Sequence, residues 1–202
     1  ASLVVVPATE IKPPIDINAS AVGAFDETGR AVFGWQTKQR WPIASLTKLM
    51  TAYVAFHKMS SEEKITMTDD ALKTEGNSGG FQNAEKFKVG DLIKAMLLVS
   101  SNDAAAALAM YYGEKDFLKD MNQTALDLGM KDTNFADPTG LSVENQSTVE
   151  DLARFTEFIY SSSPQIFAIT RRKSDTIIDI QSGKKRVLNN INIFAGRPNF
   201  IG

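Results

Sequence analysis

The sequence contains no cysteine, so thiol nucleophiles, disulfide bonds and cysteine-ligated metal sites are excluded. Histidine occurs once, at His57, which leaves little material for a site with several histidine ligands or for a Ser-His-Asp triad. No stretch approaches the ~18 consecutive apolar residues of a transmembrane helix. The 22 basic and 24 acidic residues leave a net charge of −2, so the chain lacks the basic surface of nucleic-acid binding proteins. We therefore predict no nucleic-acid partner.

What is present is typical of a globular protein. Apolar residues make up 43% and charged residues 23% of the 202 residues, enough for one domain with a buried core. The pattern predicts two strands, then a mainly helical region interrupted by a loop-rich segment over 62–89, then two more strands. This order predicts an α+β fold in which helices are inserted between strands that return to one antiparallel sheet. The expected strands are 19–26, 30–36, 175–180 and 185–188, and the expected helices are 45–58, 91–99, 103–112, 114–128 and one ending near Tyr160.

Local signals set the expected boundaries of these elements. Pro13-Pro14 predicts an extended arm over 11–17. Asp91 is the expected N-cap of the helix over 91–99, and Gly129 is expected to end the helix over 114–128. Ser147-Thr148-Val149-Glu150 has the pattern of a capping box that opens the helix ending near Tyr160. Asp137-Pro138-Thr139-Gly140 is typical of a turn.

The first candidate for chemistry is Ser45-Leu46-Thr47-Lys48. If Ser45 opens a helix, Lys48 lies one turn later on the same face. A serine hydroxyl needs a base within hydrogen-bond reach to act as a nucleophile, and a lysine can serve if burial keeps its amine neutral. The helix N-terminus adds unpaired N–H groups where an oxyanion would develop. The structural alternative is an N-cap serine followed by a solvated lysine.

The second candidate is Ser100-Ser101-Asn102, between two apolar helices. A serine and an asparagine at such a turn offer a hydroxyl for proton relay and an amide for holding a substrate peptide group. The structural alternative is that Ser101 or Asn102 caps the helix that follows.

Together the two motifs resemble the first two motifs of the Ser-x-x-Lys peptidases and β-lactamases, in the same order. The flanking residues from Pro42 to Ala52 and from Leu97 to Ala105 are similar to those of the low-molecular-mass penicillin-binding proteins, the serine-type D-alanyl-D-alanine carboxypeptidase family. The segment from Gly129 to Leu141 is similar to the segment that follows in that family. The resemblance extends over about 19–202.

The resemblance implies a serine D,D-peptidase that cleaves peptidoglycan stem peptides. Ser45 is then the nucleophile, Lys48 takes its proton, Ser100 relays a proton to the leaving amine, and Asn102 binds the substrate amide. β-Lactams would acylate the same serine. No metal and no organic cofactor is implied. The resemblance also implies a secreted or cell-envelope protein that acts outside the cytoplasmic membrane, and any membrane anchor would lie outside this chain.

The family's third motif, Lys-Thr-Gly or Lys-Ser-Gly, is absent. Lys73-Thr74-Glu75 and Lys173-Ser174-Asp175 are near misses. The chain stops at Gly202, about where the strand with this motif begins in the family. We therefore expect 1–202 to be a single incomplete domain without its C-terminal strands. The sheet part is expected over about 1–58 and 160–202, and the helical part over about 59–159.

Three alternatives to a carboxypeptidase stay open. One is a D,D-endopeptidase of the same family, because the residues from Pro138 to Val143 resemble that branch too. Another is a catalytically incomplete homologue that binds peptidoglycan or a partner protein. The third, a β-lactamase, is disfavoured because Glu144 lacks the Glu-x-x-Leu-Asn pattern.

His57 lies three turns from Ser45, ~18 Å along the helix, too far away to be its base.

Overall fold

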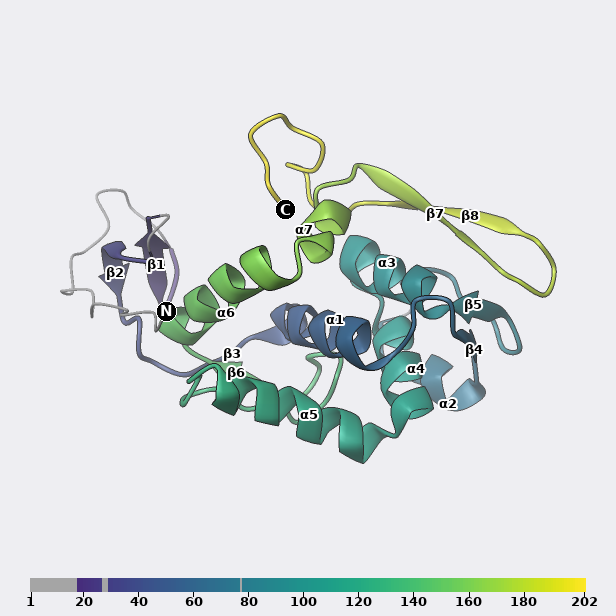
Figure 1. Ribbon diagram of the computed structural model, residues 1–202, viewed down its shortest axis with the longest axis horizontal. Coiled ribbons are helices and arrows are strands. Elements are labelled where there is room, and N and C mark those ends of the chain that lie inside the picture. Colours follow the sequence, from purple (N-terminus) through teal and green to yellow (C-terminus); the bar gives the residue numbers. More distant parts are fainter. Residues whose placement is uncertain (1–17, 27–28, 77) are drawn as a thin grey trace.

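The computed structural model describes residues 18–202 except 27, 28 and 77. The predicted extended arm with Pro13-Pro14 lies outside the described residues, as do Glu27 and Thr28 between the first two predicted strands. Helix α1 (Thr47–Lys58) lies in the middle of the molecule, with α5 (Glu114–Asp127) along one side of it and α3 (Val89–Val99) and α4 (Asn102–Tyr112) at one end (Figure 1).

All strand pairs are antiparallel, which together with the helices confirms the α+β class. The prediction of one sheet is wrong for the part of the chain that the structure describes. The strands form four separate two-stranded sheets. These pair β1 (Val22–Phe25) with β2 (Ala31–Trp35), β3 (Trp41–Pro42) with β6 (Gln146–Ser147), β4 (Lys64–Thr66) with β5 (Lys86–Lys88), and β7 (Ser174–Ile178) with β8 (Lys185–Asn189).

The first and last hairpins stay apart because each packs on a different helix. Hairpin β1–β2 lies against α6 (Val149–Ser162), at the opposite end of the molecule from β7–β8 (Figure 1). Hairpin β7–β8 packs on α3 and buries Ile177 and Leu188 there, while Ile178 and Val187 point outward. This is the alternation expected of a strand with one buried face.

The long helices form close to their predicted bounds, but two caps differ. Thr148, not Ser147, is the N-cap of α6, since its side chain accepts a hydrogen bond from the Asp151 N–H. Helix α3 begins two residues before Asp91, because Lys88 is its N-cap. Asp91 instead accepts from Lys94 and from the Ile178 N–H, so it ties α3 to β7.

Several short helices and strands were not predicted from the sequence. The segment expected to be loop-rich contains β4, β5 and α2 (Asp69–Leu72), and α7 (Gln165–Thr170) follows α6. Gly129 follows α5 with φ +72, as expected for a glycine that ends a helix.

The core lies between α1, α3, α4 and α5. Alanine occupies five of the 11 positions of α4, which favours the helix and lets α3 pack closely against it. The largest fully buried side chains include Met50, Leu92, Ile93, Leu108, Phe117 and Met121.

The short β3–β6 pair, together with a hydrogen bond from the Ile43 N–H to the Asn145 carbonyl, fixes the 137–147 segment beside the start of α1. Among the described residues, none of the helices has both the length and the apolar character that crossing a bilayer requires. The division into a sheet part and a helical part stays a prediction.

Candidate active site

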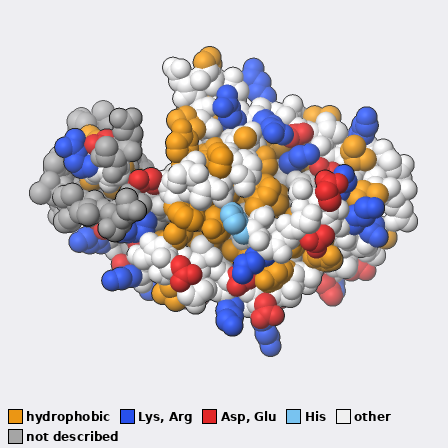
Figure 2. All heavy atoms as spheres, in the orientation of Figure 1, with side chains coloured by type: hydrophobic (Ala, Val, Ile, Leu, Met, Phe, Trp, Pro, Cys, Tyr) orange, Lys and Arg blue, Asp and Glu red, His pale blue; other side chains and the backbone are white. Residues whose placement is uncertain are grey.

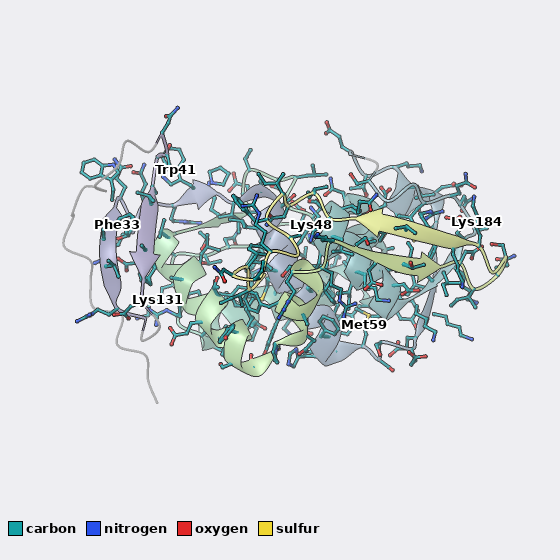
Figure 3. All side chains as sticks on the ribbon, turned by 90° about the horizontal axis from the view of Figure 1, so that it is seen from above. Phe33, Trp41, Lys48, Met59, Lys131 and Lys184 are labelled. Carbon is teal, nitrogen blue, oxygen red and sulfur yellow. The ribbon has the colours of Figure 1, made fainter. Side chains whose placement is uncertain are left out.

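Ser45 and Lys48 lie together at the start of the central helix. Ser45 is in a single turn of 3-10 helix, η1 (Ala44–Leu46), that leads directly into α1. Lys48 is one turn later, and its Nζ donates to Ser45 Oγ over 3.0 Å. Ser45 is exposed, whereas Lys48 is 3% exposed. The arrangement therefore presents a hydroxyl to solvent above a buried amine. Figure 3 shows Lys48 in the middle of the molecule, between the first and last hairpins.

The surroundings of Lys48 favour its neutral form. Burial lowers the pKa of Lys48 from 10.5 to about 8, although the negative charge of Asp137 opposes this shift. Lys48 Nζ also donates to the Thr139 carbonyl oxygen over 2.6 Å. A neutral amine can keep this hydrogen bond and turn its lone pair toward Ser45 Oγ, so Lys48 can accept the serine proton over the same 3.0 Å.

Ser100 reaches the same hydroxyl from a different element. It follows the last residue of α3 and adopts the left-handed conformation, with φ 55°. Its Oγ donates to Ser45 Oγ over 2.9 Å. Such backbone strain at a non-glycine residue costs about 1–3 kcal/mol and is found most often at functional sites. Ser101 next to it is the N-cap of α4, so the structural interpretation holds for Ser101.

Asn102 is placed differently from the other three predicted site residues. It lies in the first turn of α4, and its Nδ2 donates to the Glu75 carbonyl oxygen over 2.6 Å. That carbonyl belongs to the glycine-rich segment after α2. Ser45, Lys48 and Ser100 are thus joined by direct hydrogen bonds, while Asn102 is anchored to Glu75.

A turn at 137–145 completes the surroundings of the nucleophile. Gly140 has φ +88, and a Cβ placed on it would lie 2.0 Å from the Ala44 carbonyl oxygen and 3.1 Å from the Ser45 nitrogen. Only a glycine fits this approach. Ala44 itself has φ 46°, so the residue before the nucleophile is held in the left-handed conformation. Thr51 of α1 donates to the Pro138 carbonyl oxygen over 2.7 Å and fastens the turn to the helix.

The sequence predicted the turn but not its role. Thr139 acts through its backbone carbonyl, and a carbonyl has no residue signature. The available signals were the glycine at position 140 and the acidic residue that opens the turn.

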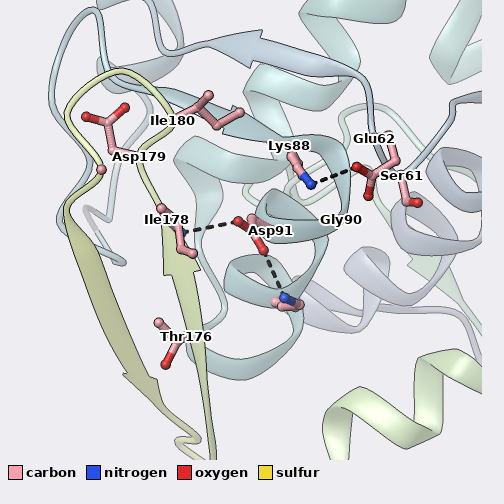
Figure 4. Close-up of a pocket in the computed structure, with 11 residues that line it drawn as sticks. Ser61, Glu62, Lys88, Gly90, Asp91, Thr176, Ile178, Asp179 and Ile180 are labelled. Carbon is pink, nitrogen blue, oxygen red and sulfur yellow. Dashed lines mark hydrogen bonds and ion pairs between the residues drawn. The ribbon is translucent and has the colours of Figure 1, made fainter.

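Two other features lie apart from Ser45. His57 is exposed, its Nδ1–H donates to the Tyr53 carbonyl oxygen, and its ring stacks on that of Tyr53 (Figure 2). A pocket of about 630 Å³ lies between α3 and the β7–β8 hairpin (Figure 4). Its lysines are already paired, Lys88 with Glu62 and Lys94 with Asp91, and no predicted site residue lines it. Chemical geometry therefore favours the Ser45 cluster over this pocket as the candidate site.

Comparisons with known proteins point the same way. A family model described as D-alanyl-D-alanine carboxypeptidase matches residues 8–200. The D-alanyl-D-alanine endopeptidase of Escherichia coli is 35% identical over 153 residues, which cover 73% of this chain and 49% of that protein. The chain spans about half the length, or less, of the curated relatives it matches.

Two solved structures are similar along most of the chain. A D-alanyl-D-alanine carboxypeptidase from Mycobacterium tuberculosis has a TM-score of 0.86 and 25% identity, and the match covers 98% of this chain and 76% of that chain. Penicillin-binding protein D2 from Listeria monocytogenes, solved in its ampicillin-bound form, has a TM-score of 0.78 and 29% identity, with 92% of this chain and 77% of that chain covered.

Proposed function

The chain belongs to the D-alanyl-D-alanine carboxypeptidase family, and from this premise we propose that it is a serine D,D-peptidase that cleaves peptidoglycan stem peptides and is acylated by β-lactams. The observation that carries the proposal is the hydrogen-bonded trio at Ser45, with Lys48 Nζ at 3.0 Å and Ser100 Oγ at 2.9 Å from the serine oxygen. This geometry fits a nucleophile with its base and a proton relay.

Acylation proceeds by transfer of the Ser45 proton to neutral Lys48 while Ser45 Oγ attacks the carbonyl carbon between the two D-alanines. The Ser45 backbone N–H, at the start of a helix, supplies one donor for the oxyanion. The C–N bond then breaks, and the departing amine takes a proton from Ser100 Oγ. Lys48, which holds the proton that Ser45 lost, returns it to Ser100, so that Lys48 is neutral again in the acyl-enzyme. Water cleaves the ester at Ser45 in the second half of the reaction. A β-lactam follows the first half, with its ring amide as the bond that breaks.

Asn102 is proposed to bind the substrate amide. An asparagine amide has two N–H donors and one carbonyl acceptor. One donor is engaged by the Glu75 carbonyl, so the second donor and the Oδ1 acceptor serve the substrate. The Glu75 contact fixes which way the amide points.

A second candidate is endopeptidase activity on cross-linked stem peptides. The 35% identity with the Escherichia coli endopeptidase favours it, whereas the similarity to the Mycobacterium tuberculosis carboxypeptidase favours release of the terminal D-alanine. Both reactions use the same acyl-enzyme. We propose an extracytoplasmic location for either, because stem peptides lie outside the cytoplasmic membrane. The expectation that 1–202 is a single incomplete domain stays a prediction.

A fluorescent penicillin tests the proposal on the intact protein. We expect covalent labelling of wild type at Ser45, located by peptide mass, and none of Ser45→Ala. Ser61→Ala, outside the site, is the matched control and should label like wild type. A pentapeptide stem and a cross-linked dimer of stems then separate the two reactions, by free D-alanine or by monomer release. If the wild-type protein is folded but is not labelled, the enzyme proposal fails. The alternative, a catalytically incomplete homologue that binds peptidoglycan or a partner protein, then takes its place.

A further inference from the structure

We infer that Asp137 is a positioning residue for the Lys48 amine: its carboxylate holds the turn that fixes Lys48 and supplies the negative charge that acts on it. The inference deepens the proposed function and rests on it, because Lys48 is the base for Ser45. It assigns a role to a residue that lies 89 positions from Lys48 in the chain and outside both the Ser45–Lys48 and the Ser100–Asn102 motifs.

The Asp137 carboxylate is the hub of the turn. Oδ1 accepts from the Thr139 N–H at 2.6 Å, the Thr139 hydroxyl at 2.6 Å and the Gly140 N–H at 2.8 Å. Oδ2 accepts from the Ser142 N–H and from Asn145 Nδ2, both at 2.7 Å. Five donors surround one carboxylate, and each needs an acceptor. The turn therefore depends on the ionised side chain of Asp137 for its shape.

The same turn holds the base. Thr139 donates its N–H and hydroxyl to Asp137, and this leaves its carbonyl directed at Lys48 Nζ, 2.6 Å away. The neighbouring Pro138 carbonyl accepts from Thr51 on the same helix as Lys48. A shift of the turn would thus move the acceptor that orients the Lys48 amine, and the amine is the group that must face Ser45.

Asp137 also acts by its charge. Burial of Asp137 favours the neutral acid, but the hydrogen bonds from Thr139, Ser142 and Gly140 outweigh burial and hold the pKa of Asp137 below its ordinary value. The carboxylate is therefore ionised at neutral pH. Its negative charge raises the pKa of Lys48 against the stronger effect of burial, which lowers it to about 8. One side chain, Asp137, thus both raises the pKa of Lys48 and fixes the position of its amine.

The Asp137→Asn variant tests both effects in the intact protein. The amide puts an NH2 group in place of one carboxylate oxygen, so the donors that met that oxygen lose their acceptor, and it removes the charge. We expect the midpoint of the pH profile for fluorescent-penicillin labelling of Ser45 to move below about 8, because the pKa of Lys48 loses the contribution that raises it. We also expect the plateau rate to fall by on the order of 10²-fold, the typical cost of misplacing a reacting group by about 1 Å.

Asp179→Asn is the matched control. Asp179 is the hub of the turn between β7 and β8, where it accepts from the N–H groups of Lys86, Gln181 and Ser182 and from the Ser182 hydroxyl. Its loss should lower thermal stability as the loss of Asp137 does, but leave the labelling profile unchanged.

A profile with lower rates and an unmoved or raised midpoint in Asp137→Asn would overturn the inference, as would an unchanged profile. If Asp137→Asn does not fold, Thr51→Val decides, since it removes the 2.7 Å hydrogen bond to Pro138 and keeps the charge. That variant should lose plateau rate with an unmoved midpoint, and wild-type rates would refute the role of the turn. Failure of the proposed function would look different, because wild type itself would not be labelled at Ser45.

Discussion

Replacing Gly140 by alanine should disable Ser45 more than it destabilises the fold. An alanine Cβ at this position would lie 2.0 Å from the Ala44 carbonyl oxygen and 2.4 Å from its carbonyl carbon, both backbone atoms. Real Cβ atoms stay beyond about 3 Å of such atoms, so the Ala44–Ser45 peptide or the turn must move by about 1 Å. A displacement of that size at a reacting group costs about 10²-fold in rate, or ~2.7 kcal/mol of transition-state stabilisation.

The assay is the rate of Ser45 labelling by a fluorescent penicillin, read beside the thermal unfolding midpoint. Gly183→Ala is the matched control, because Gly183 has φ +73, close to the +88 of Gly140, and no atom lies within 4 Å of the place where its Cβ would stand. Both variants carry the left-handed strain of about 1–2 kcal/mol. If Gly140→Ala labels within about threefold of Gly183→Ala, the argument that Gly140 shapes the nucleophile's backbone is refuted.

Two further predictions concern the base and the substrate amide. In wild type, the labelling rate should rise about tenfold from pH 7 to pH 9, because a lysine pKa of about 8 takes the neutral fraction from about 9% to about 91%; a flat profile would contradict Lys48 as the base. Gly76→Ala should slow labelling and raise KM for a stem pentapeptide several-fold, because its Cβ would approach Asn102 Nδ2 to 3.0 Å. Gly80→Ala, with φ +62 and open space around it, should have little effect, and equal behaviour of the two variants would remove Asn102 from the binding role.

The parts of the fold that could be predicted depend on short stretches of sequence. The helices formed near their expected bounds because apolar periodicity and capping act within a few residues. The spacing of Ser45 and Lys48 is of the same kind, since residues three apart on a helix are neighbours. The resemblance added the order of the motifs, and with it the expectation that Ser100 belongs with Ser45.

The parts that could not be predicted depend on contacts between distant segments. No local pattern tells whether a strand pairs with the first hairpin or only with its neighbour, so the single sheet was wrong. The substrate-binding role of Asn102 stays a prediction, and its hydrogen bond to Glu75 could not be predicted because Glu75 lies in a segment with no periodicity. Asp137 looked like an ordinary turn residue, because its hydrogen bonds to the turn are local while their effect on Lys48 is not.

The balance at Lys48 explains why the site needs both distant segments. At the ordinary pKa of 10.5 a lysine is neutral in only about 0.03% of molecules at pH 7, whereas a pKa of about 8 makes roughly 300-fold more neutral base available. Burial alone would lower the pKa further, and a weaker base accepts the serine proton less readily. The charge of Asp137 limits that loss of basicity. The packing of α1 and the turn at Asp137 therefore act in opposite directions on one amine, and together they keep its pKa near the pH at which a general base is most effective.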